Sequence, residues 1–65
     1  MVKNKLKEIR QKKKISQTEL AEISKVSRST ISNLEAKDNY ITTTNTLENI
    51  AKALGVKVKD IFFIE

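Results

Sequence analysis

The segment between residues 28 and 33 carries polar side chains suited to hydrogen bonding with the edges of nucleic-acid bases. Arg28 has a planar guanidinium that can donate two hydrogen bonds to guanine, and Asn33 has a carboxamide that can pair with adenine in a similar way. Ser29 and Ser32 add hydroxyl groups that can reach base edges or phosphate. In a helix, three of these residues share one outward side and Arg28 lies at its flank near the N-terminus. A polar, solvated face is also the usual surface of an exposed helix, so the interpretation depends on the surrounding elements.

Capping residues predict two short helices around this segment. Ser16 and Glu19 have the spacing of a capping box, which predicts a helix over about residues 17–24. Ser27 is a good N-cap for a following helix over about residues 28–36. The two helices are too short to be stable without tertiary packing.

The apolar residues of these helices predict a steep crossing. The side chains that can meet in one core are Leu20, Val26, Ile31 and Leu34. Ala21 leaves room for the second helix to approach the first, and either Ser24 or Ile23 also points inward. This arrangement predicts a helix-turn-helix over about residues 17–36, a motif whose second helix typically lies in the major groove of DNA.

Apolar spacing predicts three further helices, over about residues 3–13, 43–54 and 58–62. Gly55 is placed to stop the second of these at its C-terminal end. No strand pattern is longer than a few residues, so we predict an all-α fold of five helices in one domain over residues 1–65, with an apolar tail at 61–64.

Composition limits the function classes. The chain has 65 residues, with 13 Lys and Arg against 8 Asp and Glu, and this net charge of +5 favours a polyanionic partner, although a merely soluble basic protein fits as well. The absence of Cys and His excludes disulfides and metal sites built on thiolate or imidazole. No apolar run approaches the roughly 20 residues of a membrane span, so we predict a cytoplasmic protein.

The residues of the predicted helix-turn-helix resemble those of a known protein family. Residues 15–22 (ISQTELAE) and 26–35 (VSRSTISNLE) closely resemble the XRE family of phage-repressor-like regulators. Residues 47–56 (LENIAKALGV) and the pair Ile61-Phe62 look like the fourth and fifth helices of that family. The resemblance implies a compact five-helix, lambda-repressor-like fold in which the third helix reads bases.

A second set of residues is predicted to hold the DNA backbone. The amides at the N-termini of the second and third helices can bind phosphate. The side chains expected to contact phosphate or to position the protein are Gln17, Ser27, Thr30, Lys37, Asn39 and Tyr40. Two departures from the family pattern affect this region: Lys25 stands where glycine is usual and must adopt a positive φ, and the loop after the third helix is about one residue longer and lacks its proline.

The resemblance also implies a structural ion pair between Arg10 in the first helix and Glu35 at the end of the third. Removing one partner of a buried pair costs roughly 3–5 kcal/mol, whereas an exposed pair contributes little.

The apolar tail predicts self-association. Phe63 and Ile64 extend beyond the expected core, and exposed contiguous apolar surface usually marks an interface, so we predict that both lie in a two-fold dimer interface. In the alternative, both residues fold back and cap the core of a monomer.

We therefore predict a transcriptional regulator, specifically a repressor that binds a palindromic operator on double-stranded DNA as a homodimer. The sequence predicts no enzymatic activity, no cofactor, no metal and no small-molecule ligand, since it has no glycine-rich phosphate loop and its carboxylates are scattered. Two alternatives stay open: a module that binds another protein, and a DNA-binding antitoxin of a toxin pair.

Overall fold

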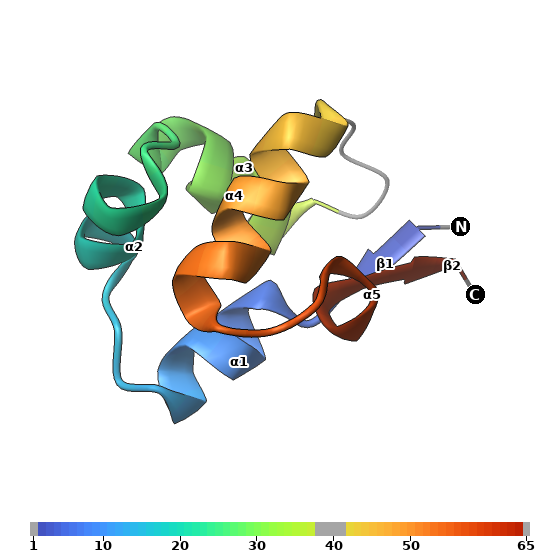
Figure 1. Ribbon diagram of the computed structural model, residues 1–65, viewed down its shortest axis with the longest axis horizontal. Helices are drawn as coiled ribbons and strands as arrows, with labels where there is room; N and C mark the ends of the chain where they lie inside the picture. The colour runs from blue at the N-terminus through green and yellow to red at the C-terminus, as the bar shows by residue number, and fades with distance from the viewer. Residues whose placement is uncertain (1, 38–41, 65) are drawn as a thin grey trace.

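Five short helices enclose one apolar core in the computed structural model, which describes residues 2–37 and 42–64 (Figure 1). The helices are α1 (Leu6–Lys12), α2 (Gln17–Ser24), α3 (Arg28–Ala36), α4 (Thr44–Leu54) and α5 (Val58–Ile61). Two short strands, β1 (Val2–Asn4) and β2 (Phe62–Ile64), flank them. The prediction of an all-α, five-helix fold is confirmed, and α2 and α3 span the predicted helix-turn-helix of residues 17–36.

Side-chain caps begin three of the five helices, α2, α3 and α4. The Ser16 hydroxyl accepts a hydrogen bond from the Glu19 amide at 3.0 Å, and the Glu19 carboxylate accepts one from the Ser16 amide at 3.5 Å. This is the predicted capping box. Ser27 caps α3 and Thr43 caps α4 in the same manner, each through an amide three residues further on. Because each cap satisfies an amide with no partner inside the helix, the helix starts are fixed locally by sequence.

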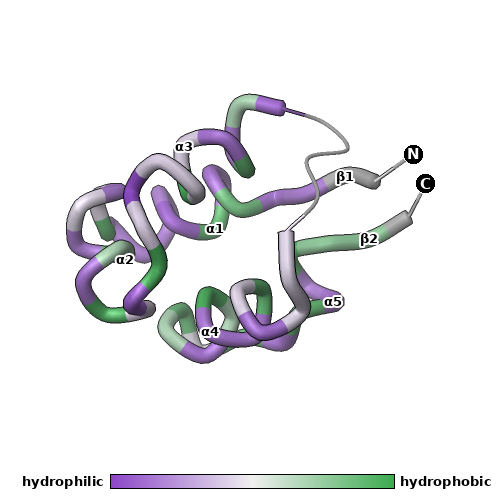
Figure 2. The backbone as a smooth tube through the Cα atoms, turned by 90° about the horizontal axis from the view of Figure 1, so that it is seen from above, coloured by the Kyte–Doolittle hydropathy of each residue, from purple (hydrophilic) through white to green (hydrophobic). Residues whose placement is uncertain are grey.

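The core is formed by one apolar stripe from each helix. Leu6 of α1, Ile50 of α4 and Ile61 of α5 are completely buried. From α2, α3 and the turn between them come Leu20, Val26, Ile31 and Leu34, as predicted. Seen from above, α1 and α3 lie on one side of the molecule and α4 on the other (Figure 2). No helix in the described ranges is long and apolar enough to cross a membrane.

The turn between α2 and α3 has the predicted left-handed residue. Lys25 has φ 59° and ψ 31°, the region that favours glycine. The sequence left open whether Ser24 or Ile23 points inward, and the structure buries Ser24, whose hydroxyl donates to the Leu20 carbonyl oxygen. Ile23 is 55 % exposed.

The two strands are the main feature that the sequence analysis did not predict. The first helix was expected from residue 3 or 4, but residues 2–4 form β1, which pairs antiparallel with β2 in the register Val2–Ile64, Lys3–Phe63 and Asn4–Phe62. Asn4 explains the later helix start, because its side-chain oxygen accepts a hydrogen bond from the Leu6 amide at 3.2 Å. Lys5 then donates its amide to the Ile61 carbonyl oxygen at 2.8 Å, which joins the start of α1 to the end of α5.

A buried ion pair connects α1 to α3. The Arg10 Nε atom lies 2.7 Å from Glu35 Oε2, and a second guanidinium nitrogen donates to Oε1 at 3.0 Å. The two side chains are only 11 % and 4 % exposed. Hydrogen bonding to Glu35 raises the pKa of Arg10 above its usual value; burial opposes this effect and the negative charge of Glu35 reinforces it. The geometry matches the pair that the family resemblance implied.

The strained turn predicts a stabilising substitution. We expect Lys25→Gly to raise the free energy of unfolding by about 0.5–1 kcal/mol, because the relief of left-handed strain exceeds the added entropy of the unfolded chain. Urea denaturation followed by circular dichroism measures this change. Lys25→Ala is the matched control, since it removes the same charge and keeps the strain. A glycine variant no more stable than the alanine variant would contradict the prediction.

The ion pair predicts that substitutions of Arg10 and Glu35 have strongly non-additive effects on the free energy of unfolding. We expect Arg10→Met or Glu35→Leu alone to cost about 3–5 kcal/mol, because each leaves a buried charge without its partner. The double variant should lose much less free energy of unfolding than the two single variants lose together. Thermal unfolding in sulfate, which strengthens the native state, keeps the single variants measurable.

The exposed pair between Glu8 and Lys12 serves as the control for this cycle. The Lys12 Nζ atom lies 3.8 Å from Glu8 Oε1, and both side chains are largely solvated. We therefore expect Glu8→Gln to change the free energy of unfolding by no more than about 0.5 kcal/mol. Additive losses in the Arg10 and Glu35 cycle would show that the two side chains contribute separately.

Candidate nucleic-acid interface

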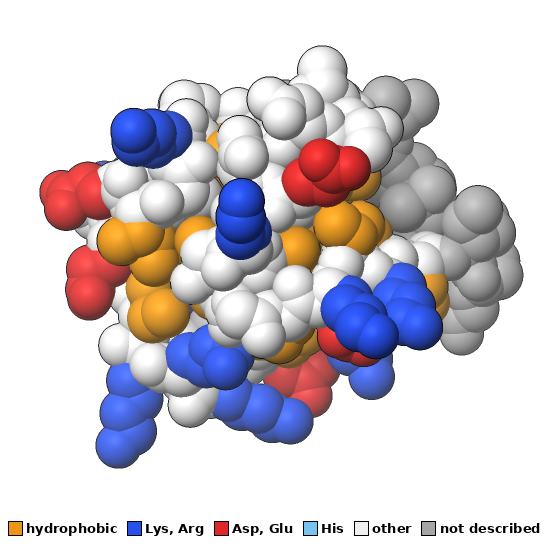
Figure 3. All heavy atoms as spheres, in the orientation of Figure 1, with side chains coloured by type: hydrophobic (Ala, Val, Ile, Leu, Met, Phe, Trp, Pro, Cys, Tyr) orange, Lys and Arg blue, Asp and Glu red, His pale blue; other side chains and the backbone are white. Residues whose placement is uncertain are grey.

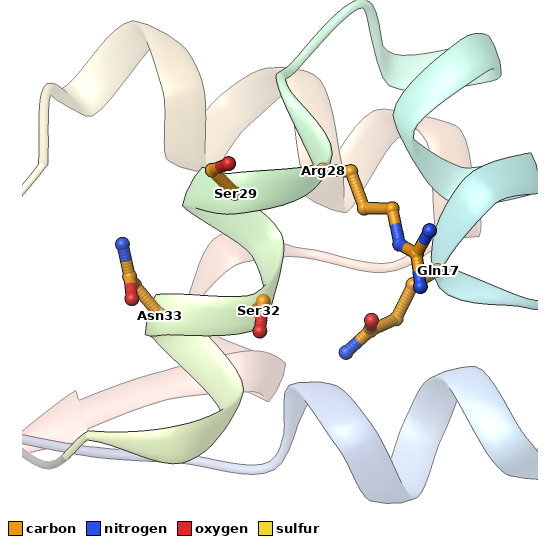
Figure 4. Close-up of a pocket in the computed structure, with 5 residues that line it drawn as sticks. All are labelled: Gln17, Arg28, Ser29, Ser32 and Asn33. Carbon is orange, nitrogen blue, oxygen red and sulfur yellow. The ribbon is translucent and has the colours of Figure 1, made fainter.

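A shallow groove of about 490 Å³ runs along the outer side of α3. Its lining residues are Gln17, Arg28, Ser29, Ser32 and Asn33 (Figure 4). The structure therefore brings together all four residues predicted to read bases. The fifth, Gln17, was predicted to contact phosphate, and it joins them from the start of α2.

The helical period explains why these side chains share one surface. Ile31 and Leu34 point into the core, so the residues between them point away from it. Ser29 and Ser32 are exposed, and Asn33 is half-buried. The predicted division of α3 into an inner and an outer side is confirmed at these positions.

Arg28 is the only charged residue among the five that line the groove. It is exposed at the first position of α3, and its side chain extends across the groove toward Gln17 (Figure 4). Asn33 lies more than one turn further along the helix, on the other side of the groove. The cation and the carboxamide are thus separated along α3, with the serine hydroxyl groups between them.

Gln17 has a structural contact that the sequence did not reveal. Its amide nitrogen donates to Glu35 Oε1 at 3.2 Å, so it shares that carboxylate with Arg10. The Arg10 guanidinium also donates to the Ile15 carbonyl oxygen at 2.7 Å, directly before α2. These bonds join α1, the start of α2 and the end of α3, and they fix Gln17 beside Arg28.

The other positioning residues differ in their environments. Ser27 and Thr30 are bonded to each other, with hydroxyl oxygens 2.8 Å apart, and Ser27 also accepts from the Thr30 amide at 3.2 Å. Lys37 is exposed directly after α3. Asn39 and Tyr40 lie outside the described residues.

One further contact of α3 was missed by sequence analysis. The Asn4 side-chain nitrogen donates to the Leu34 carbonyl oxygen at 2.7 Å. This bond joins the end of β1 to the last turn of α3 and, with the Arg10–Glu35 pair, holds that end of the helix. An isolated asparagine near the N-terminus gives no sequence signal for such a contact, because the partner is a backbone atom 30 residues away.

Comparison with known proteins agrees with this geometry. Residues 6–61 match the model of a protein family described as helix-turn-helix. The chain is also 40% identical, over 60 residues, to a protein of Bacillus phage phi105 named immunity repressor protein. The match covers 92% of this chain and 41% of the phage protein, so the chain spans less than half the length of that relative. The chain therefore belongs to the XRE-type helix-turn-helix family.

Proposed function

We propose that this protein is a transcriptional repressor that binds double-stranded DNA and reads its sequence with α3. The observation that carries the proposal is the groove on the outer side of α3, where a guanidinium, two carboxamides and two hydroxyl groups meet without an apolar residue among them. The similarity to a phage immunity repressor supports the repressor role.

The proposed contacts follow from groove dimensions and side-chain chemistry. The major groove of DNA, about 12 Å wide, admits a single helix, and Arg28 can then donate two hydrogen bonds to guanine while Asn33 pairs with adenine. Ser29 and Ser32 are short, so they reach base edges only when α3 lies deep in the groove.

Contacts between the protein and the DNA phosphates would determine how deeply α3 lies in the major groove. The first amides of α2 and α3 have no partner within their helices and carry a partial positive charge, which suits phosphate. Lys37, at the other end of α3, adds a mobile cation that can reach the phosphate on the far side of the groove. Gln17 can add a phosphate contact through the second N–H of its carboxamide, since the first is donated to Glu35. Acting on DNA fits the cytoplasmic location predicted from sequence.

The proposal includes a homodimer on a palindromic operator. Phe63 remains half-buried in β2, with the Lys5 ammonium nitrogen 5.9 Å from the centre of its ring. A strand with one unpaired edge and a partly exposed aromatic side chain suits pairing with a second copy. A two-fold dimer would place two α3 helices about 34–36 Å apart, on successive major grooves.

Selection from a random duplex pool tests base reading. We expect the wild type to enrich a palindrome with half-sites about 10–11 base pairs apart, and Arg28→Ala or Asn33→Ala to lose about 1–3 kcal/mol of discrimination at one position of each half-site. Ala36→Ser is the control, because it changes an exposed residue of α3 outside the groove and should leave the selected sequence unchanged.

The same selection, repeated at two salt concentrations, separates the alternatives. Affinity should fall steeply with salt, because bound phosphates release counterions. Salt-dependent binding without any enriched sequence would contradict base reading. No binding to any duplex would favour a module that binds another protein.

A substitution in the tail tests the dimer. We expect Phe63→Lys to shift the protein toward the monomer in sedimentation equilibrium and to reduce enrichment of the palindrome to that of a single half-site. Lys57→Ser, at an exposed position before α5, is the control. Circular dichroism checks that the variant retains its helices. A folded Phe63→Lys variant that still selects the full palindrome would rule out the tail as the dimer interface.

A further inference from the structure

The surface between α2 and α4 forms a second groove, of about 450 Å³. It is lined by Ile23, Ser24, Lys25, Asn49, Lys52 and Ala53, none of which lines the groove along α3. Ile23 is the only large hydrophobic residue that is exposed in the described part of the chain.

A single exposed isoleucine is common on protein surfaces, so the significance of Ile23 depends on its neighbours. On α2, Glu19 lies one turn before Ile23 and Glu22 lies directly beside it, and both are exposed. On the other side of the groove, α4 presents Lys52, and Lys25 follows α2. Within residues 2–37 and 42–64, the ion pairs are Arg10–Glu35 and Lys12–Glu8, so these four charges have no ion-pair partner there.

Glu19 and Glu22 therefore lie on the α2 side of the groove, and Lys52 lies on the α4 side. Figure 3 shows acidic side chains at the α2 edge, hydrophobic side chains beside them, and a basic side chain beyond, over the middle of α4; an acidic side chain lies further along α4. A partner with a uniformly acidic surface would satisfy the lysines but would face Glu19 and Glu22 with like charge. A partner carrying the same order of charges in reverse satisfies both edges, and a second copy of this chain rotated by two-fold symmetry has that order.

We infer that the α2–α4 groove is a contact surface between two copies of this protein, with Ile23 at its centre. Around a two-fold axis, the two Ile23 side chains pack together, while Glu22 of each copy faces Lys52 of the other. The contact uses no residue of the α3 groove, so it is independent of DNA binding and distinct from the proposed tail dimer.

The size of this surface determines how tightly we expect two copies to associate. Stable complexes bury about 1,200–2,000 Å² in total, and one isoleucine with a few flanking side chains from each copy supplies less. We therefore expect a weak, concentration-dependent contact that forms when copies are held close together. Increasing salt should weaken it further, because the charge pairs are exposed to solvent.

A charge exchange between two variants tests the inference. Glu22→Lys places lysine against Lys52 when two identical copies meet, and Lys52→Glu places glutamate against Glu22. Each variant alone should therefore self-associate less than the wild type. An equal mixture restores both charge pairs at once, since the lysine of one variant meets the glutamate of the other.

NMR spectroscopy measures association in this mixture. One variant is isotope-labelled and is titrated with the other variant, which is unlabelled. We expect resonances of Ile23, Asn49 and Ala53 to shift in the mixture and much less when either variant is titrated with itself. Ile23→Ser should weaken wild-type association about tenfold or more, because it removes apolar surface from both copies. All variants keep the same tail, so a tail dimer affects every titration alike.

Two results would overturn the inference: a mixture that associates no better than either variant alone, or wild-type shifts confined to residues outside the groove. Ile23 is exposed, so its substitution should leave the thermal unfolding temperature nearly unchanged. Lys59→Glu, on α5, is the matched control, because it changes the net charge by the same amount as Lys52→Glu but lies outside the groove. It should not restore association when mixed with the Glu22→Lys variant.

Discussion

The buried carboxylate of Glu35 is the interaction on which the arrangement of the other parts depends. It accepts hydrogen bonds from Arg10 in α1 and from Gln17 at the start of α2, while it belongs to the last turn of α3. A charge at this depth is stable only if its hydrogen-bonding capacity is satisfied, so the three helices must keep their relative positions. The same bonds place Gln17 beside Arg28, which connects the interior of the protein to the surface proposed to read DNA.

Polar bonds have this importance because the apolar core is small. Each helix contributes one stripe of side chains, and a chain of 65 residues buries a smaller share of its surface than a larger domain does. The pairing of β1 with β2 and the bond from Asn4 to the Leu34 carbonyl oxygen add backbone connections at the edge of the core. They hold the first and last described segments together beside the end of α3.

The surface divides into regions with different chemistry. The groove along α3 is polar and contains one cation, whereas the groove between α2 and α4 combines an exposed isoleucine with two lysines and lies beside the glutamates of α2. The strands add a third region, where Phe63 is only partly covered by its own chain. Because the three regions share no lining residue, the proposed contacts with DNA and with other copies of the protein use separate surfaces of one small domain.

Sequence by itself determined the features that depend on near neighbours along the chain. The caps at Ser16 and Ser27, the stop at Gly55 and the division of α3 into two sides follow from bonds and periodicity within a few residues. The Arg10–Glu35 pair was available only through family resemblance, because its partners are 25 residues apart. The tertiary structure alone decided the β1–β2 pairing, the bond between Gln17 and Glu35, and the burial of Ser24 in place of Ile23. Each of these depends on which distant atoms lie nearby after folding, and local pattern carries no information about that distance.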